Sequence, residues 1–246
     1  MNQIQDLPNI EPTKNGFGYM HNKSFIMDEF VLFSKNAKKP VLDIGAAYGV
    51  ATIKAINEGS TVIACDIDKR HLDLLIARIP YLERNKLIPL VARFPNETNF
   101  KNKSIQAVLL SHVLSFLEGD EIDEGIRKIS SWLDDGGKLF ILNYTPYHTT
   151  LADFISTYEK NKLSGMKWPG YLKDKRLYKR YSTEQDNVPN RLNLLDIDIL
   201  KRIADENGFH IDFLKYIGGV NQGVPEIYCL DGKEWVGMIA TKMGSI

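Results

Sequence analysis

Cysteine is scarce in this chain of 246 residues, which contains only Cys65 and Cys229. Two cysteines cannot build a disulfide framework, and they show no metal-ligand spacing, so we expect a reducing cytosol and no metal site. An excess of charge is also missing, because 31 Lys and Arg balance 31 Asp and Glu. A neutral chain has no global field that recruits nucleic acid or an acidic membrane.

Long apolar runs are absent as well. No segment approaches the roughly 20 apolar residues of a membrane-spanning helix. The opening stretch, MNQIQDLPNIEPTKNG, is polar and broken by proline, with no apolar signal segment. These absences predict a cytoplasmic protein without a membrane partner, and they leave its oligomeric state open.

What the chain does contain is an alternation of short apolar runs and helical patterns. Strands are predicted at residues 40–44, 61–66, 86–91, 104–111, 137–144, 209–217 and 234–242. Helices are predicted to start near Ser24 and to cover Tyr48–Glu58, Asp68–Ile79, Glu121–Leu133 and residues 192–209. Continuous Val, Ile and Leu runs separated by helices indicate an α/β fold with a mostly parallel sheet of seven strands. The last two strands have no helix between them, so they should pair antiparallel.

We expect a single domain over residues 1–246, with a poorly ordered arm over 1–23 and a lid insertion over 146–190. The insertion is about 45 residues long, too long for a plain connection. It contains seven aromatic residues, and eight Lys or Arg with one Asp lie between Lys160 and Arg180. We interpret it as a cap over a pocket.

The stretch VLDIGAAYGVAT combines an apolar strand, the carboxylate of Asp43 and a small-residue loop that opens into a helix. Gly45 and Gly49 flank Ala46 and Ala47, and such residues let the backbone approach a ligand at a helix N-terminus. A dinucleotide loop has its second glycine where Ala47 stands. Asp43 would repel a pyrophosphate but attract a ligand that carries an ammonium and a sulfonium. The loop therefore favours S-adenosylmethionine over NAD.

A second carboxylate, Asp66, ends the predicted strand TVIACD. An acidic residue there can accept both ribose hydroxyls of an adenosine, with Ile67 against the adenine. This placement supports an adenosine ligand without choosing between cofactors.

Together with LDDGGKLFIL, in which Asp135 replaces the usual proline, these motifs resemble those of class I S-adenosylmethionine-dependent methyltransferases. The resemblance covers about residues 24–145 and the last helix and two strands. It implies a three-layer, Rossmann-like fold with helices on both faces and an antiparallel final strand. It also implies S-adenosylmethionine as cofactor and S-adenosylhomocysteine as product.

The resemblance further implies which residues hold the cofactor. Asp43, Gly45, Ala46 and Ala47 would hold the methionine part, and Asp66 would hold the ribose. Ile67, Arg93 and Phe94 would lie at the adenine, and Ser111 with His112 beneath the methyl group. Gly49 completes the predicted cofactor-binding set.

Acceptor contacts are predicted where substrates bind in open α/β sheets, beyond the strand ends. The predicted set is Tyr19, His112, Tyr144, His148, Trp168 and Tyr171. His148 and His112 are the candidate bases, because imidazole titrates near neutrality. Capping, lid packing or a structural histidine are the alternatives for these side chains.

The hypothesis for function is methyl transfer to a small molecule through an O, N or C nucleophile. A nucleic-acid methyltransferase that uses the basic tract 160–180, a non-catalytic S-adenosylmethionine-binding module, and more distantly an NAD-linked oxidoreductase remain as alternatives. A base is needed only if the acceptor carries a proton at neutral pH, so the sequence indicates the reaction without indicating a catalytic residue.

Overall fold

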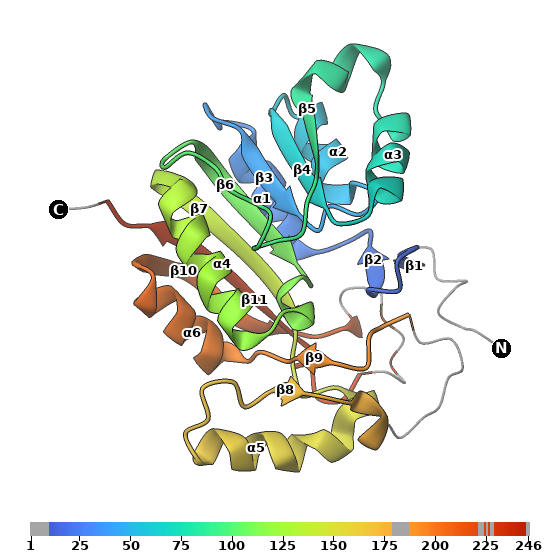
Figure 1. Ribbon diagram of the computed structural model, residues 1–246, viewed down its shortest axis with the longest axis vertical. Coiled ribbons are helices and arrows are strands. Elements are labelled where there is room, and N and C mark those ends of the chain that lie inside the picture. The colour runs from blue at the N-terminus through green and yellow to red at the C-terminus, as the bar shows by residue number, and fades with distance from the viewer. Residues whose placement is uncertain (1–9, 179–186, 221–223, 225, 227–228, 245–246) are drawn as a thin grey trace.

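A sheet of seven strands forms the centre of the computed structural model, which describes residues 10–178, 187–220, 224, 226 and 229–244 (Figure 1). The strand order is β10-β11-β7-β6-β3-β4-β5. The strands are β3 (Val41–Ile44), β4 (Val62–Asp66), β5 (Leu87–Val91), β6 (Ile105–Ser111), β7 (Leu133–Tyr144), β10 (Phe209–Ile217) and β11 (Trp235–Lys242). Within this described sheet, only β11 runs opposite to the other six strands. The predicted fold class is confirmed.

Helices cover both faces of the sheet. Helices α1 (Phe25–Ser34), α2 (Val50–Asn57) and α3 (Lys69–Arg78) lie on one face, and α4 (Gly119–Trp132) and α6 (Ile197–Glu206) lie on the other (Figure 1). Side chains alternate between the two faces along each strand. In β4, Val62 and Ala64 therefore join the apolar cluster of the first three helices, whereas Ile63 and Cys65 join that of α4 and α6. Burial on both faces explains the continuous apolar runs.

The predicted helix over residues 192–209 is wrong in its first part. Leu192–Asn193 form the short strand β9, and α6 begins only after Asp196. The Asp196 side chain accepts a hydrogen bond from the backbone N of Ile199 at 3.0 Å, which caps the helix. A polar capping residue inside an apolar run therefore sets the helix start.

The segment 146–190 contains η3 (Thr149–Phe154), α5 (Ile155–Leu163), β8 (Tyr171–Leu172) and η4 (Lys175–Leu177). Beside the main sheet it forms its own apolar cluster with β9 and the residues after it, made of Leu151, Phe154, Tyr158, Leu172, Leu192 and Leu194. Strand β8 pairs antiparallel with β9, and α5 lies beyond the sheet at the bottom of Figure 1. Residues 179–186, which include Tyr181 and the end of the basic tract, lie outside the described residues. The lid role of this segment stays a prediction.

Residues 10–21 form a hairpin rather than a poorly ordered arm. Strands β1 (Ile10–Pro12) and β2 (Tyr19–His21) pair antiparallel. The Tyr48 hydroxyl donates to the backbone O of Pro12 at 3.1 Å, and the Asn187 amide donates to the backbone O of Thr13 at 2.9 Å. These tertiary hydrogen bonds order a segment that has no helical or strand periodicity of its own.

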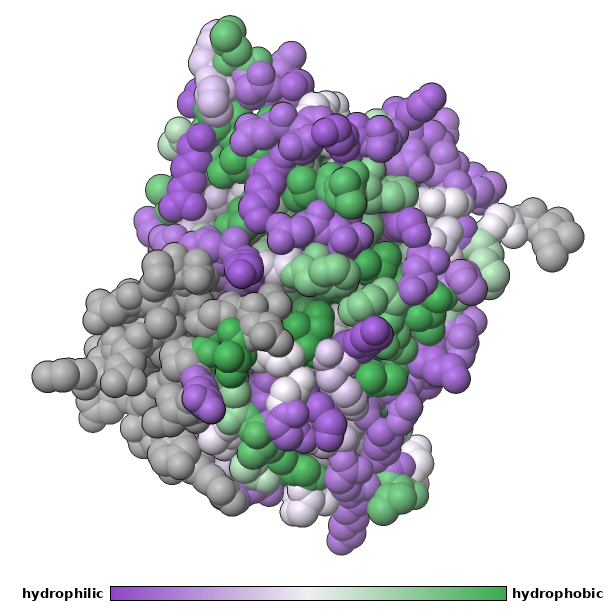
Figure 2. Space-filling view, turned by 180° about the vertical axis from the view of Figure 1, so that it is seen from behind, coloured by the Kyte–Doolittle hydropathy of each residue, from purple (hydrophilic) through white to green (hydrophobic). Residues whose placement is uncertain are grey.

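Hydrophilic side chains cover most of the described rear face, and apolar residues are scattered among them (Figure 2). Scattered apolar residues are normal on a protein surface. None of the helices in the described part of the chain has the length and apolarity that crossing a membrane requires. The cytoplasmic location stays a prediction.

Candidate active site

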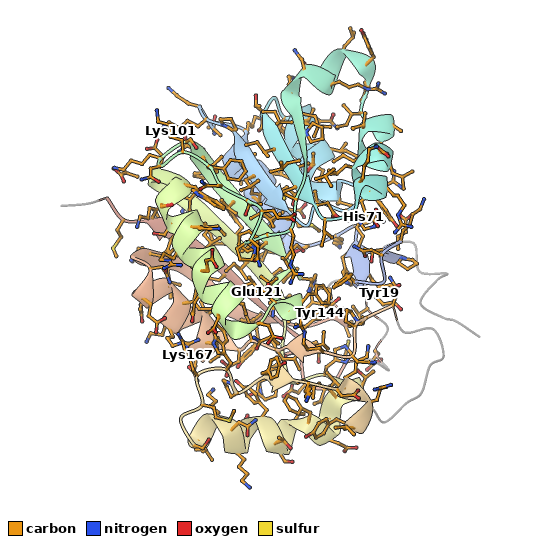
Figure 3. All side chains as sticks on the ribbon, in the orientation of Figure 1. Tyr19, His71, Lys101, Glu121, Tyr144 and Lys167 are labelled. Atoms are coloured by element: carbon orange, nitrogen blue, oxygen red, sulfur yellow. The ribbon has the colours of Figure 1, made fainter. Side chains whose placement is uncertain are left out.

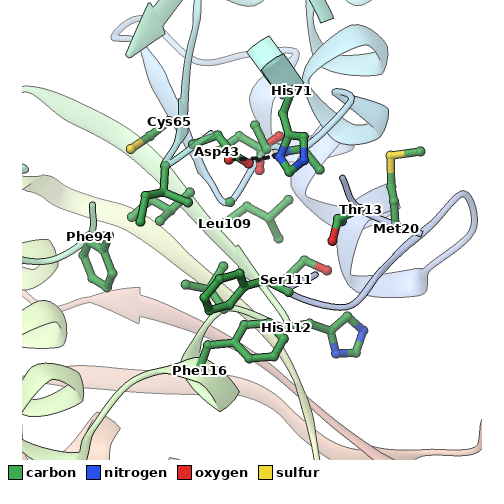
Figure 4. Close-up of a pocket in the computed structure, with 18 of the residues that line it drawn as sticks. Thr13, Met20, Asp43, Cys65, His71, Phe94, Leu109, Ser111, His112 and Phe116 are labelled. Carbon is green, nitrogen blue, oxygen red and sulfur yellow. Dashed lines mark hydrogen bonds and ion pairs between the residues drawn. The ribbon is translucent and has the colours of Figure 1, made fainter. Parts of the chain in front are cut away.

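A pocket opens where β3, β4 and β6 end (Figure 4). Because parallel strands end at the same edge of a sheet, residues far apart in sequence meet there. Of the predicted cofactor-binding residues, those in the lining are Asp43, Gly45, Ala46, Ala47, Asp66, Ile67, Arg93, Phe94 and Ser111. Gly49 is not in the lining of the pocket, and it is the N-cap residue of α2.

Hydrogen bonds to the end of β4 hold the loop between β3 and α2. The backbone O of Cys65 accepts hydrogen bonds from the N–H groups of Gly45 at 2.8 Å and Ala46 at 3.1 Å, and Asp66 accepts from Ala47 N at 2.9 Å. Gly45 has a φ of +74°, and a Cβ there would lie 2.5 Å from Cγ2 of Val113. The N–H groups that a pyrophosphate loop offers to its ligand are thus already used inside the protein.

Asp43 is a buried carboxylate at the base of this loop, with an exposed fraction of 4%. Thr52 Oγ1 donates a hydrogen bond to it at 2.7 Å, and no ion pair reaches it from the described residues. Burial raises the pKa of Asp43 to about 6, the Thr52 hydrogen bond opposes this rise, and the nearby Asp66 adds to it. A cationic ligand would supply the missing positive charge.

Asp66 ends β4 and makes several contacts. Its carboxylate accepts hydrogen bonds from the backbone N of Ala47 and, at 2.8 Å, from that of Asp68. Nδ1 of the buried His71, on α3, lies 3.1 Å from Asp66 Oδ1. His71 also lines the pocket, and the sequence motifs did not place it there. His71 lies in the first turn of α3, shortly after the end of β4, and this position in the sequence could have indicated that it lines the pocket.

The residues predicted around the adenine have different environments. Ile67 is an apolar side chain with an exposed fraction of 52% in the pocket lining, which suits a planar ring. The Arg93 guanidinium pairs with Glu121 at 2.9 Å, whereas the Phe94 ring is buried and packs on Gly125. Their contact with adenine stays a prediction.

The opposite end of the pocket is aromatic (Figure 4). His112 follows β6, and the sequence-predicted Tyr19 and His112 both line the pocket there. Tyr144 is outside the lining but supports His112, because the two rings stack with centroids 4.2 Å apart. Sequence reasoning placed neither Phe17 nor Phe116 in the site, and their rings meet edge to face at 5.6 Å.

Besides Tyr144, three more predicted substrate residues lie outside the lining of this pocket. The His148 ring caps η3, accepting a hydrogen bond from Thr150 N. Trp168 packs against Arg202, whose guanidinium carbon is 4.6 Å from the ring centroid, and the Tyr171 hydroxyl is 3.3 Å from Glu118. The pocket geometry therefore brings together Tyr19 and His112, but not these three.

Comparison with known proteins agrees with this geometry. A sequence profile described as a methyltransferase domain matches residues 41–137. A search of curated proteins found no significant match. Residues 41–137 are therefore a methyltransferase domain.

Among solved structures, an S-adenosylmethionine-dependent methyltransferase from Methanosarcina mazei has 16% identity and a TM-score of 0.62, covering 87% of this chain and 98% of that one. A glycopeptide N-methyltransferase in complex with S-adenosyl-L-methionine has 16% identity and a TM-score of 0.58, with coverages of 89% and 86%. A geranyl diphosphate methyltransferase has 12% identity and a TM-score of 0.59, with coverages of 88% and 84%. The profile match and the shared fold bear out the predicted resemblance to S-adenosylmethionine-dependent methyltransferases, and they support S-adenosylmethionine as the cofactor.

Proposed function

We propose that the protein transfers the methyl group of S-adenosylmethionine to a small molecule bound beside His112. The observation that carries this proposal is the hairpin over the pocket, which contributes Thr13, Asn15, Phe17, Tyr19, Met20 and His21 to the lining. A site that the chain itself covers suits a ligand that can be enclosed. A nucleic-acid strand would need an open groove that follows its backbone.

The cofactor supplies an electrophilic methyl group, and the residues of this chain bind and orient. Asp43 would face the positive charge of the bound cofactor, Asp66 would accept the ribose hydroxyls, and Ile67 would cover the adenine. Orientation of the two reactants is worth roughly 7–11 kcal/mol when it is complete. Closure by the hairpin excludes water from the transfer.

The basic tract supports the same choice, because acidic side chains of the protein neutralise much of its described charge. Lys162 lies 2.5 Å from both Asp196 and Asp198. Lys167 pairs with Asp123 at 2.5 Å, and it lies apart from Tyr19 and His71 in Figure 3. Cations that are already paired offer little to a phosphate backbone.

Two of the structural neighbours also support a small acceptor without indicating which one. One is a glycopeptide N-methyltransferase and another a geranyl diphosphate methyltransferase. These two acceptors share little chemistry, so the acceptor must be inferred from the pocket of this chain.

The test supplies methyl-labelled S-adenosylmethionine together with a low-molecular-mass acceptor panel or, separately, transfer RNA and duplex DNA. We expect label in the small-molecule fraction and none in nucleic acid. Asp66→Asn serves as the cofactor-binding control, and Asp73→Asn, on the exposed side of α3, as its matched partner. Label in RNA or DNA would contradict the proposal. Cofactor binding without any labelled product would favour a non-catalytic module.

A further inference from the structure

Two buried histidines lie side by side at the aromatic end of the pocket. His21 comes from β2 and His112 follows β6, and their ring centroids are 5.2 Å apart. Their exposed fractions are 7% and 6%, and both line the pocket. Among the described residues, none of the four ring nitrogens has a hydrogen-bond partner. An unpaired buried polar group costs roughly 1–3 kcal/mol, so two adjacent unpaired rings indicate that a ligand supplies the partners.

Aromatic packing fixes the orientation of both rings. The Trp235 ring meets His21 edge to face at 4.7 Å and His112 at 5.0 Å. Tyr144 stacks on the other side of His112. His112 also has a φ of 60°, a strained backbone conformation of the kind found at functional sites. The pair is therefore rigid before any acceptor binds.

Both imidazoles are neutral at physiological pH. Burial lowers the pKa of His21 to about 4, and burial together with the neighbouring His21 lowers the pKa of His112 well below its ordinary value. A neutral imidazole offers one N–H donor and one acceptor nitrogen. An acceptor molecule with an O–H or N–H group can satisfy both functions.

The walls beside the pair indicate the shape of that molecule. Phe17 and Phe116 form an edge-to-face pair in the lining. A Cβ on Gly18, between Phe17 and Tyr19, would lie 3.3 Å from Cζ of Phe116, so the hairpin approaches this ring closely. Aromatic side chains in a pocket lining favour a flat ring as ligand, which they can contact in an offset or edge-to-face arrangement.

We propose that His21 and His112 together hold the proton-bearing nucleophile of a flat aromatic acceptor, and that His21 is a second residue that contacts the acceptor. This inference rests on the proposed function and names the acceptor class. In the transfer, the acceptor oxygen or nitrogen forms a bond to the methyl carbon, and the methyl–sulfur bond breaks with its electron pair going to sulfur. Bond formation to the methyl carbon makes the acceptor proton strongly acidic, so the proton passes to a neutral imidazole nitrogen and then to water, leaving methylated acceptor and S-adenosylhomocysteine.

The test measures binding of two probes, 2-naphthol and naphthalene, to protein saturated with S-adenosylhomocysteine. The probes share a flat ring, and only 2-naphthol carries an O–H group. A site built to hydrogen-bond a hydroxyl discriminates strongly against an analogue that lacks it, so we expect at least about tenfold tighter binding of 2-naphthol. Burial of apolar area alone would favour naphthalene.

Variants then assign the preference to the pair. His21→Phe keeps a ring against Trp235 but removes both hydrogen-bonding nitrogens. His112→Asn suits the left-handed backbone, which asparagine tolerates. Each variant should lose most of the preference and still bind S-adenosylhomocysteine within about threefold of the parent, since this product lacks the methyl group beside which His112 is placed. His210→Gln, an exposed histidine on β10, is the matched control and should keep the preference.

Equal binding of the two probes by the parent protein, or no binding of 2-naphthol, would overturn the inference. Retention of the full preference in both variants would do the same. Failure of the proposed function gives a different result, namely label in nucleic acid in the transfer assay. A small-molecule product together with equal probe binding would rule out the proposed role of the histidine pair and leave the proposed function in place.

Discussion

The two ends of the pocket differ in how completely their polar groups are satisfied. At the cofactor end, the Asp66 carboxylate has three neighbours from the protein and Asp43 has Thr52. At the acceptor end, the nitrogens of His21 and His112 have none among the described residues. The comparison teaches that the chain builds the cofactor end in advance and leaves the acceptor end for its ligand to complete.

The largest effect should come from breaking the cofactor loop. Gly45→Ala places a Cβ 2.5 Å from Val113 at a φ of +74°. Left-handed strain of about 1–2 kcal/mol and overpacking of about 1–3 kcal/mol should together lower the free energy of unfolding by roughly 2–5 kcal/mol and remove S-adenosylmethionine binding. Urea denaturation and calorimetry measure the two effects.

Gly136→Ala is the matched control, because Gly136 has the same φ of +74° and no atom within 4 Å of the added Cβ. Its free energy of unfolding should fall only by the cost of the left-handed strain, roughly 1–2 kcal/mol, and it should keep cofactor binding. Equal losses in the two variants would mean that contact with Val113 does not position the loop.

The second effect isolates the Asp66 carboxylate. In Asp66→Asn, the side-chain amide brings a donor toward the N–H groups of Ala47 and Asp68, which need acceptors. S-adenosylmethionine affinity should fall by about 10- to 100-fold, the range for a lost charged hydrogen-bond partner. Isothermal calorimetry checks this, with Asp73→Asn as a control that keeps parental affinity. Unchanged affinity in Asp66→Asn would refute the ribose assignment.

The same contrast explains what the sequence can predict. Asp43, Asp66 and Ser111 each stand at or next to the end of an apolar run, and parallel packing brings such ends together. Local patterns therefore predict the sheet and the cofactor end.

The acceptor end depends on contacts between residues distant in sequence. His21, His112 and Trp235 meet from a hairpin, a strand end and the last strand, and no periodicity connects them. Trp168 and Tyr171 belong to a segment whose aromatic composition fits a pocket wall as well as packing against the rest of the chain. Composition alone cannot decide between these environments, because both bury aromatic area.

A third, smaller effect is the pH dependence of the cofactor end. The ionised form of Asp43 attracts a cation, and its pKa of about 6 means that it becomes protonated between pH 7 and pH 5. If only the ionised form binds, S-adenosylmethionine affinity at pH 5 should be about tenfold weaker than at pH 7. Asp43→Asn should bind weakly at both values, and a parent affinity that does not change with pH would contradict the role of this carboxylate.

Stability changes with pH in the opposite direction to cofactor binding. Folding raises the pKa of Asp43 from 3.8 to about 6, so the folded state favours the protonated form. The contribution of Asp43 to stability is therefore fully present below pH 3.8 and is lost as pH rises through about 6. Relative to Asp43→Asn, the parent should thus lose stability between pH 5 and pH 7, as urea denaturation can measure.

The smallest expected effect concerns the hairpin that covers both ends. Asn187 holds it, since its amide donates to the backbone O of Thr13 and of Gly18, and its own backbone O accepts from Gly18 N. Asn187→Ala removes only the side-chain contacts, worth roughly 0.5–1 kcal/mol each, so the covered state should weaken by about 1–2 kcal/mol. Amide hydrogen exchange over residues 13–19 should speed up accordingly, while the sheet stays protected. Asn161→Ala removes a comparable amide contact, to the backbone O of Pro169 away from the pocket, and should leave this exchange unchanged. Equal exchange in both variants would show that the hairpin closes without Asn187, and the acceptor end would then be enclosed by β1, β2 and their contact with Tyr48 alone.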